Sequence, residues 1–290
     1  AVRRPDNEIE LKVEDYKCVF GNAKFLKYPL IRGVVSFVDS LVVGTKCLMY
    51  SAEIAGDEED EEDKQKNAAL SEEELAAKKA KEDKQFKWLL YVTVAVSIVV
   101  SVAAFMLLPY ALASLCRRVG ASEFAVTIVE AFVKLALFMG YMLLISRMKD
   151  IQRTFMYHGA EHKCINCIEH GLELNVENVR KSSRQHKRCG TSFLFFVMIV
   201  SIIFCFFITA QSQIARVLIR LALLPVIAGV SYEIIKLAGN SENPFVNLLS
   251  RPGMWVQNMT TKEPDDDMIE VGIRAVEAVF DWKNWQKENL

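Results

Sequence analysis

The sequence predicts an all-α polytopic membrane protein with four transmembrane helices and a small mixed cytoplasmic cap. Apolar residues make up 52% of the 290 positions although 24% are charged, an apolar share that is high for a soluble chain with so much charge. The two kinds of residue are also segregated. Charge collects before residue 90, in a middle loop and in the tail, whereas apolar residues collect in four runs. Runs of this length fit helices that cross a bilayer.

Composition also limits the function. A net charge of -1 provides no basic surplus for neutralising phosphates, which argues against nucleic acid as a partner. The seven cysteines are odd in number and scattered, which is typical of reduced thiols and not of a disulfide framework. The lipid bilayer is therefore the principal partner that the composition predicts.

The predicted spans cover residues 86–108, 124–146, 193–210 and 217–238. We expect Pro109 to end the first span, because proline cannot continue the helical hydrogen-bond ladder. The second span contains Glu130 and Lys134. Their i,i+4 spacing lets the two charges neutralise each other on one helix face.

The distribution of basic residues predicts the orientation. Four spans place both termini on the same side as the loop 147–192, which carries nine lysines or arginines. The segment between the first two spans offers only Arg117 and Arg118. Because short basic loops stay in the cytoplasm, we expect a multi-pass protein whose loop and termini are all cytoplasmic.

The N-terminal region is predicted to consist of a cytoplasmic segment, residues 1–56, and an acidic charged arm, residues 57–85. Residues 8–28 have the pattern of short strands broken at Gly21. Residues 30–50 are apolar but interrupted by charges, which favours a helix lying in the membrane interface over a span. The acidic arm is typical of a solvated spacer, and docking to a partner protein is the alternative.

The membrane domain is thus expected over residues 86–238 and a cytoplasmic tail over 239–290. The tail starts with a loop-like stretch, after which Asp265 to Asp267 are expected to begin a helix, because negative charge stabilises a helix N-terminus. Apolar residues recur at helical spacing in this helix, at Ile269, Ile273, Val276 and Phe280. We expect this stripe to pack on the chain's own cytoplasmic face, with a partner protein as the alternative.

The stretch "MYHGAEHKCINCIEHG", residues 156–171, contains three of the four histidines. The helical spacing of the second span continues into it, and Gly171 is a natural helix end. His158 and His162 then lie one turn apart on one face, beside Glu161. The order H-x-x-E-H is found in inverted zinc peptidases. Such a histidine pair can hold Zn²⁺ or another divalent metal, and the adjacent carboxylate can act as the catalytic base toward metal-bound water.

A third metal ligand is required, and the sequence leaves it open. The candidates are Glu169 on the same helix face, His186 and Cys189 in the returning loop, and Glu233 near the end of the fourth span. Residues 184–193 have three interpretations: a thiolate ligand, an anion site at a helix start, or a basic membrane anchor. A pairing of Glu233 with Lys236 is an alternative to ligation. The histidines could also cap carbonyls and bind no ion.

Further motifs are long and specific: "PLIRGVVSFVDSLVVGTK", "YSAE", "R..H.RCGTSF", "SYEIIK", "SENP", "PGMW" and "TTKEPDDDMIEV". With them, the chain resembles the bacterial YqhQ-like family, a membrane family of unknown function, over nearly its whole length. Members are often labelled metal-dependent enzymes. The resemblance implies a bacterial plasma membrane location and points to the same site residues, namely His158, Glu161, His162, His186, Cys189 and Glu233.

The leading functional hypothesis is a membrane-embedded metal-dependent enzyme, a hydrolase with its site at the cytoplasmic face. The histidine pair would bind the metal, Glu161 would be the base, and Cys189, His186 or Glu233 would complete the shell. The substrate would be a lipid headgroup or a membrane-bound peptide. The alternative is a non-enzymatic membrane-protein assembly or translocon-associated factor that contacts its partner through the acidic arm and the C-terminal helix.

Overall fold

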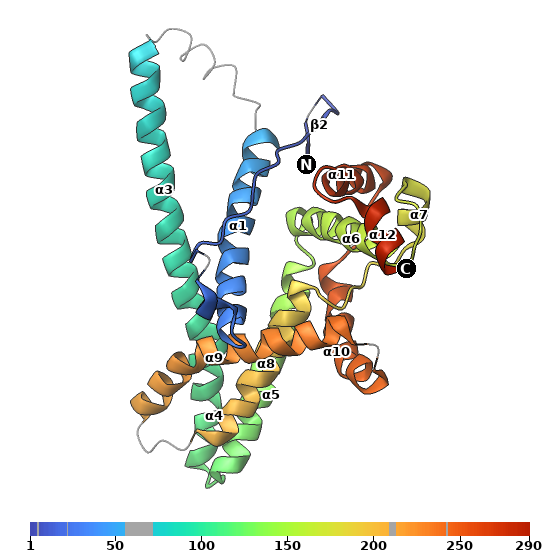
Figure 1. Ribbon diagram of the computed structural model, residues 1–290. Coiled ribbons are helices and arrows are strands. Elements are labelled where there is room, and N and C mark those ends of the chain that lie inside the picture. Colours follow the sequence, from blue (N-terminus) through green and yellow to red (C-terminus); the bar gives the residue numbers. More distant parts are fainter. Residues whose placement is uncertain (5, 22, 56–71, 209–212, 242) are drawn as a thin grey trace. The chain divides into compact units, whose positions relative to one another are not determined.

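The computed structural model describes residues 1–290 apart from residues 5, 22, 56–71, 209–212 and 242 (Figure 1). The chain forms two compact units, which we describe separately. The first combines Ala1–Ser51 with Met139–Leu290, and the second is Ala52–Phe138. Helices α1 (Ile31–Ala55) and α5 (Glu123–Ile145) each run from one unit into the other. Residues 57–71 of the predicted acidic arm lie outside the described residues.

The second unit contains α3 (Glu72–Val102), a π-helical stretch (Ala103–Leu107), α4 (Leu108–Arg118) and most of α5. The prediction that Pro109 ends the first span is wrong. Pro109 lies in the first turn of α4, where a missing amide N–H costs little. The π-helical stretch before it absorbs the local change in hydrogen bonding, so the apolar helix continues to Arg118.

Five described helices are long and apolar enough to cross a membrane. They are Ile31–Ser51 of α1, Tyr91–Arg118 of α3 and α4, Glu123–Ile145 (α5), Gly190–Phe207 (α8) and Ile214–Asn240 of α9 (Gln213–Asn240). The last four match the four predicted spans. The count of four is not confirmed, because α1 meets the same criterion. The prediction that both termini lie on the same side of the membrane requires an even number of spans. It stays a prediction.

The charges that argued against a span at residues 30–50 have partners within the first unit. Arg32 forms an ion pair with Glu233 of α9. Asp39 is buried and accepts hydrogen bonds from the Tyr16 hydroxyl and the Val19 amide. A paired charge costs far less in apolar surroundings than an unpaired one. Because the charges of α1 have these partners, they do not argue against a span at this helix.

Removing one partner of the Arg32–Glu233 pair is expected to cost more than removing both. Arg32→Leu leaves the Glu233 carboxylate unpaired beside apolar helices, and we expect a lower free energy of unfolding. The double variant Arg32→Leu/Glu233→Leu should recover most of this loss. Thermal unfolding in lipid nanodiscs measures both. A double variant whose loss equals the sum of the two single losses would contradict the pairing.

The rest of the described first unit consists of helices and one small sheet, joined by loops. Strands β1 (Val2–Arg3) and β2 (Ile9–Glu10) pair antiparallel, and a 3-10 helix covers Lys24–Lys27. The remaining helices are α6 (Lys149–Glu169), α7 (Val176–Lys181), α8, α9, α10 (Pro244–Thr260), α11 (Asp266–Glu277) and α12 (Trp282–Asn289). In Figure 1, α6 lies beside α7, α11 and α12, and α8 packs on α9 and α10. The predicted strands over residues 8–28 are therefore confirmed only at Ile9–Glu10.

Two other predictions about elements differ from the structure. The helix of the second span does not continue into the histidine motif, because α5 ends at Ile145 and Met148 has an extended backbone, with ψ of 128°. The stretch after the fourth span is not a loop. It forms α10, which begins where the Asn243 side chain caps the Phe245 amide at 2.9 Å. The break before α6 lets that helix take its own direction.

Candidate metal centre

The candidate site is built on helix α6, and an apolar cluster holds α6 against α11 and α12. The cluster contains Ala160, Cys164, Cys167 and Ile168 of α6, Ile269 and Ile273 of α11, and Trp282 of α12. Gly272 allows α11 to approach closely, because a Cβ there would lie 3.2 Å from the Cys164 sulfur. The C-terminal stripe thus packs within its own fold, as predicted. As also predicted, α6 stops before Gly171, which has a positive φ of 71°.

Three potential metal ligands meet at one end of this cluster. His158 and His162 lie on one face of α6, and Cys189 comes from the loop before α8. One ligand atom from each lies within 4.8 Å of the other two, and His158 Nε2 is 3.3 Å from Cys189 Sγ. Nitrogen and sulfur ligands of one tetrahedral zinc ion are separated by roughly 3.5 Å, given zinc–ligand distances of about 2.0 to 2.3 Å. The spacing therefore fits a shared ion.

Both imidazole rings are oriented from behind by backbone carbonyls. His158 Nδ1–H donates to the Thr260 carbonyl at 2.9 Å, and His162 Nδ1–H donates to the Arg184 carbonyl at 2.7 Å. A carbonyl oxygen only accepts, so each Nδ1 carries a proton and, in a neutral ring, the Nε2 lone pair is available to a metal. Metal-binding histidines are commonly held by such contacts.

The loop that carries Cys189 is clamped to α6 on one side. Lys163 Nζ donates to the carbonyls of Arg180 and Ser182, each at 2.9 Å, and its side chain is only 5% exposed. Asn166 Nδ2 donates to the carbonyls of Ser183 and Gln185. These side chains stand on the same helix as the two histidines. They therefore fix the returning loop relative to the ligands.

Helix α10 clamps the other side of the loop through Gln257, which is fully buried. Gln257 Oε1 accepts from the His186 amide at 2.9 Å, while Nε2 donates to the His186 carbonyl at 2.8 Å and to Ser192 Oγ at 2.7 Å. Cys189 lies between these two anchor points in the sequence. Gln257 therefore positions Cys189 through the loop backbone. Among the described residues, no hydrogen bond joins the side chains of Gln257 and Cys189.

Cys189 is the N-cap of α8, and its sulfur also accepts from the Thr191 amide at 3.4 Å. Burial is the largest influence on this thiol and raises its pKa, but the hydrogen bonds and charges of His158 and His162 outweigh burial and lower the pKa to about 5. For His158, burial lowers the pKa, but the hydrogen bond and charge of Cys189 leave it raised. The metal-free site thus favours a thiolate beside an imidazolium, and a thiolate is the form of cysteine that binds metals.

The ionisation of Cys189 can be followed in metal-free protein. At pH 7 the ultraviolet absorbance should show one more thiolate in the wild type than in Cys189→Ser. The difference should vanish as the pH falls through about 5, because protonation then restores the thiol. If the difference arises only above about pH 8, where an ordinary thiol ionises, the lowered pKa is wrong.

The structure does not bring the other predicted ligands into the group of three. His186 Nε2 lies 3.1 Å from the Glu169 carboxylate, which also pairs with Arg188. The hydrogen bond from His186 and burial act in opposite senses on Glu169, and its pKa is lowered. Glu233 is the partner of Arg32. Glu161 is exposed, and it lines a pocket beside α6 instead of joining the three ligands.

The sequence reasoning missed the residues that position the ligands. Lys163 and Asn166 follow the histidines on α6 at close spacing and could have been noticed as polar residues on a packed helix. Gln257 is distant in the sequence and lies in a stretch predicted to be a loop, so no local signal marks it. Gly159 weakens an isolated helix, but the structure requires it: a Cβ there would lie 2.1 Å from the Lys262 carbonyl oxygen.

Comparison with known proteins assigns the family. A family model described as "Protein of unknown function (DUF1385)" matches residues 28–282. The chain belongs to the DUF1385 family. This DUF1385 chain is also 35% identical over 273 residues to "Uncharacterized protein YqhQ" from Bacillus subtilis (strain 168), covering 91% of this chain and 80% of that protein. The predicted YqhQ-like membership is confirmed. No solved structure matches this DUF1385 protein.

Proposed function

We propose that this DUF1385 protein is a membrane-embedded, zinc-dependent hydrolase with His158, His162 and Cys189 as its metal ligands. The observation that carries the proposal is the set of three donors, with both imidazoles oriented through Nδ1. Among the described residues, no fourth His, Cys, Asp or Glu joins the group. Structural zinc sites have four protein ligands, whereas catalytic sites have three and keep a position for water. The donor count therefore supports a catalytic site.

The ligand types support zinc. Two imidazoles and a thiolate suit Zn²⁺, which is bound through nitrogen and sulfur in tetrahedral geometry. An ion at this position would supply a bound water with a lowered pKa. Glu161 precedes His162, is exposed, and interacts electrostatically with the His158 ring. We assign it the role of the base that takes the proton from that water.

The cytoplasmic face is the side we propose for the site. Residues 147–192, which include the two histidines and Cys189, carry nine lysines or arginines between candidate spans α5 and α8. Basic loops are retained in the cytoplasm, and this argument does not depend on the total number of spans. A plasma membrane location is proposed together with this orientation.

Metal analysis of purified protein tests the ligands. We expect one zinc per chain in the wild type and in His170→Ala, and none in His158→Ala/His162→Ala. His170 is a matched control, because it directly follows α6 and, among the described residues, its ring has a hydrogen bond to the Asn166 carbonyl and does not belong to the group of three ligands. Glu161→Gln should keep its zinc and lose hydrolytic activity. Wild-type protein without stoichiometric metal, or zinc retained in the double variant, would contradict the proposal.

Cobalt substitution distinguishes a catalytic site from a structural one. Co²⁺ in the site should give a thiolate-to-cobalt absorption band that depends on Cys189. Added azide should change the band if an exchangeable position is present, because a closed four-ligand site cannot accept it. A band that azide leaves unchanged would indicate a structural metal. That result would favour the non-enzymatic assembly or translocon-associated factor.

A further inference from the structure

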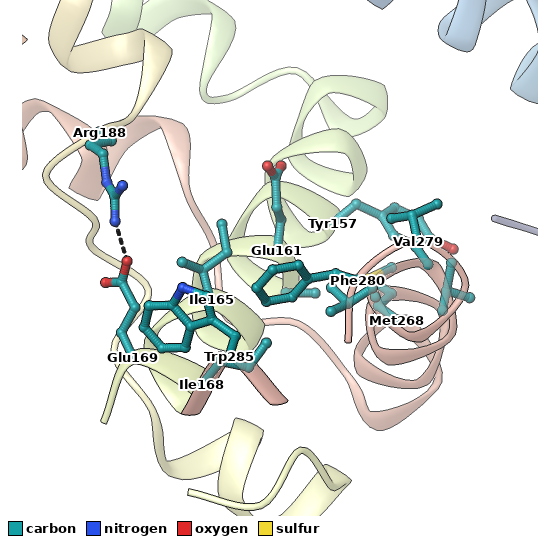
Figure 2. Close-up of a pocket in the computed structure, with 15 residues that line it drawn as sticks. Tyr157, Glu161, Ile165, Ile168, Glu169, Arg188, Met268, Val279, Phe280 and Trp285 are labelled. Carbon is teal, nitrogen blue, oxygen red and sulfur yellow. Dashed lines mark hydrogen bonds and ion pairs between the residues drawn. The ribbon is translucent and has the colours of Figure 1, made fainter. Parts of the chain in front are cut away.

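A pocket of about 580 Å³ lies between α6 and α11, and Trp285 of α12 also lines it (Figure 2). Its volume is within the range of ligand sites in proteins, about 300 to 1,000 Å³. Most of the side chains that line it are apolar or aromatic, including Ile165, Met268, Val276 and Phe280. The pocket borders the apolar cluster that holds α6 and α11 together, because Ala160, Ile168 and Met268 belong to both.

The pocket and the three candidate ligands involve the same two segments of the chain. Glu161, which lines it, lies between His158 and His162 in the sequence of α6. Arg188, which also lines it, immediately precedes Cys189. A molecule in the pocket would therefore contact the same stretch of α6 and the same loop that carry the candidate ligands.

The charges at the pocket define what can bind. Glu169 and Arg188 pair with each other, and Figure 2 shows this contact as a dashed line. Glu161 lies apart from that pair, and the structure gives its carboxylate no hydrogen bond or ion pair with any described residue. The charged side chains of the lining are thus two carboxylates and one guanidinium, which give the otherwise apolar pocket a net charge of −1. Charge complementarity disfavours phosphate headgroups and fatty acids, which would add a second negative charge, and favours a positive group.

We propose that this pocket binds an apolar peptide segment that carries a lysine or arginine side chain, and that such a segment is the substrate of the hydrolase. The apolar side chains of the peptide occupy the α6–α11 wall, and its positive charge is attracted by the net negative charge of the lining, to which Glu161 contributes. The substrate assignment rests on the proposed function, whereas the binding of the peptide does not.

Peptide binding to full-length protein in nanodiscs tests the proposal. The probes are two short fluorescein-labelled peptides of leucine and serine that differ only in one central residue, lysine or glutamate. Fluorescence anisotropy should show the lysine peptide binding about tenfold more tightly, which corresponds to about 1.4 kcal/mol. Glu161→Gln should abolish this preference without changing the binding of the glutamate peptide more than about twofold.

A matched pair of variants tests the location. Ala275→Trp fills the pocket, because Ala275 lines it, whereas Ala278→Trp places the same side chain at an exposed position on the end of α11. Ala275→Trp should weaken binding of the lysine peptide at least about tenfold, and Ala278→Trp should leave it unchanged. Equal effects of the two variants, or equal affinity for both peptides in the wild type, would overturn the proposal.

Two further measurements separate the alternatives. Short-chain phosphatidylglycerol should not displace the lysine peptide; displacement by it would mean that the pocket takes lipid, and the proposal would be wrong. The variant His158→Ala/His162→Ala should still bind the lysine peptide but should not cleave it. Wild-type protein that binds the peptide but contains no zinc would contradict the proposed enzyme and support the pocket assignment. Wild-type protein that contains zinc but does not bind the peptide would contradict the pocket assignment and support the metal site.

Discussion

Gly159→Ala is expected to destabilise the protein by about 3 kcal/mol, an unusually large effect for one added methyl group. The new Cβ would lie 2.1 Å from the Lys262 carbonyl oxygen. A backbone atom cannot move aside as a flexible side chain can, and the Lys262 amide is itself bonded to the Phe155 carbonyl at 2.9 Å. The segment after α10 must therefore shift away from α6. The Thr260 carbonyl moves with it, so we also expect a loss of zinc affinity.

Gly140→Ala is the matched control, because it makes the same change in a helix where nothing lies within 4 Å of the added Cβ. Alanine favours a helix over glycine by up to about 1 kcal/mol, so stability should stay the same or rise slightly. Thermal unfolding and metal content are measured on both variants in the same nanodiscs. If Gly159→Ala unfolds at the wild-type temperature with its zinc in place, the close approach of α6 and residue 262 is wrong.

Gln257→Leu is the second change for which we expect a large loss. Leucine nearly fills the volume of glutamine but leaves the His186 amide, the His186 carbonyl and the Ser192 hydroxyl without their partner. An unsatisfied buried polar group costs about 1 to 3 kcal/mol, so we expect a total loss of about 3 kcal/mol or more. Because the same bonds fix the loop around Cys189, zinc affinity should fall about 10- to 100-fold.

Gln185→Leu tests whether this effect comes from burial. The Gln185 amide also bridges the loop to α10, through Asn258 at 2.8 Å, but this contact is exposed. Water can replace it, so stability should change by no more than about 0.5 kcal/mol. Urea unfolding and zinc competition with a chromophoric chelator give the two quantities. Equal losses in the two variants would show that Gln257 is not a special anchor of the site.

The local part of the site could be predicted from sequence, and the non-local part could not. The one-turn spacing of His158 and His162 and the helix end before Gly171 follow from helical periodicity alone. The choice of Cys189 over His186 or Glu233 depends on how the loop returns to α6, which is decided by Lys163, Asn166 and Gln257. These side chains donate hydrogen bonds to backbone carbonyls, which every residue type has. The bonds therefore leave no pattern of residue types in the sequence.

The fold shows the same division between local and distant information. Long apolar runs correctly marked α5, α8 and α9 as candidate spans, because length and hydropathy define a candidate span. Helix α1 was predicted to lie in the interface because Arg32 and Asp39 count as costs until their partners, Glu233 and Tyr16, are known, and it also meets the length and composition of a span. Pro109 was misjudged for a local reason: a proline ends a regular α-helix, but a π-helical turn before it allows the helix to continue.

The carbonyl that orients His158 belongs to Thr260, and this has a consequence for the order of events during synthesis. A nascent chain that has emerged only as far as α8 already contains His158, His162 and Cys189. It still lacks the segment that sets the ring of His158, because translation proceeds from the N-terminus. For the proposed metal site, we therefore expect stable capture of an ion only after α10 has emerged, which would make metal loading a late step of synthesis.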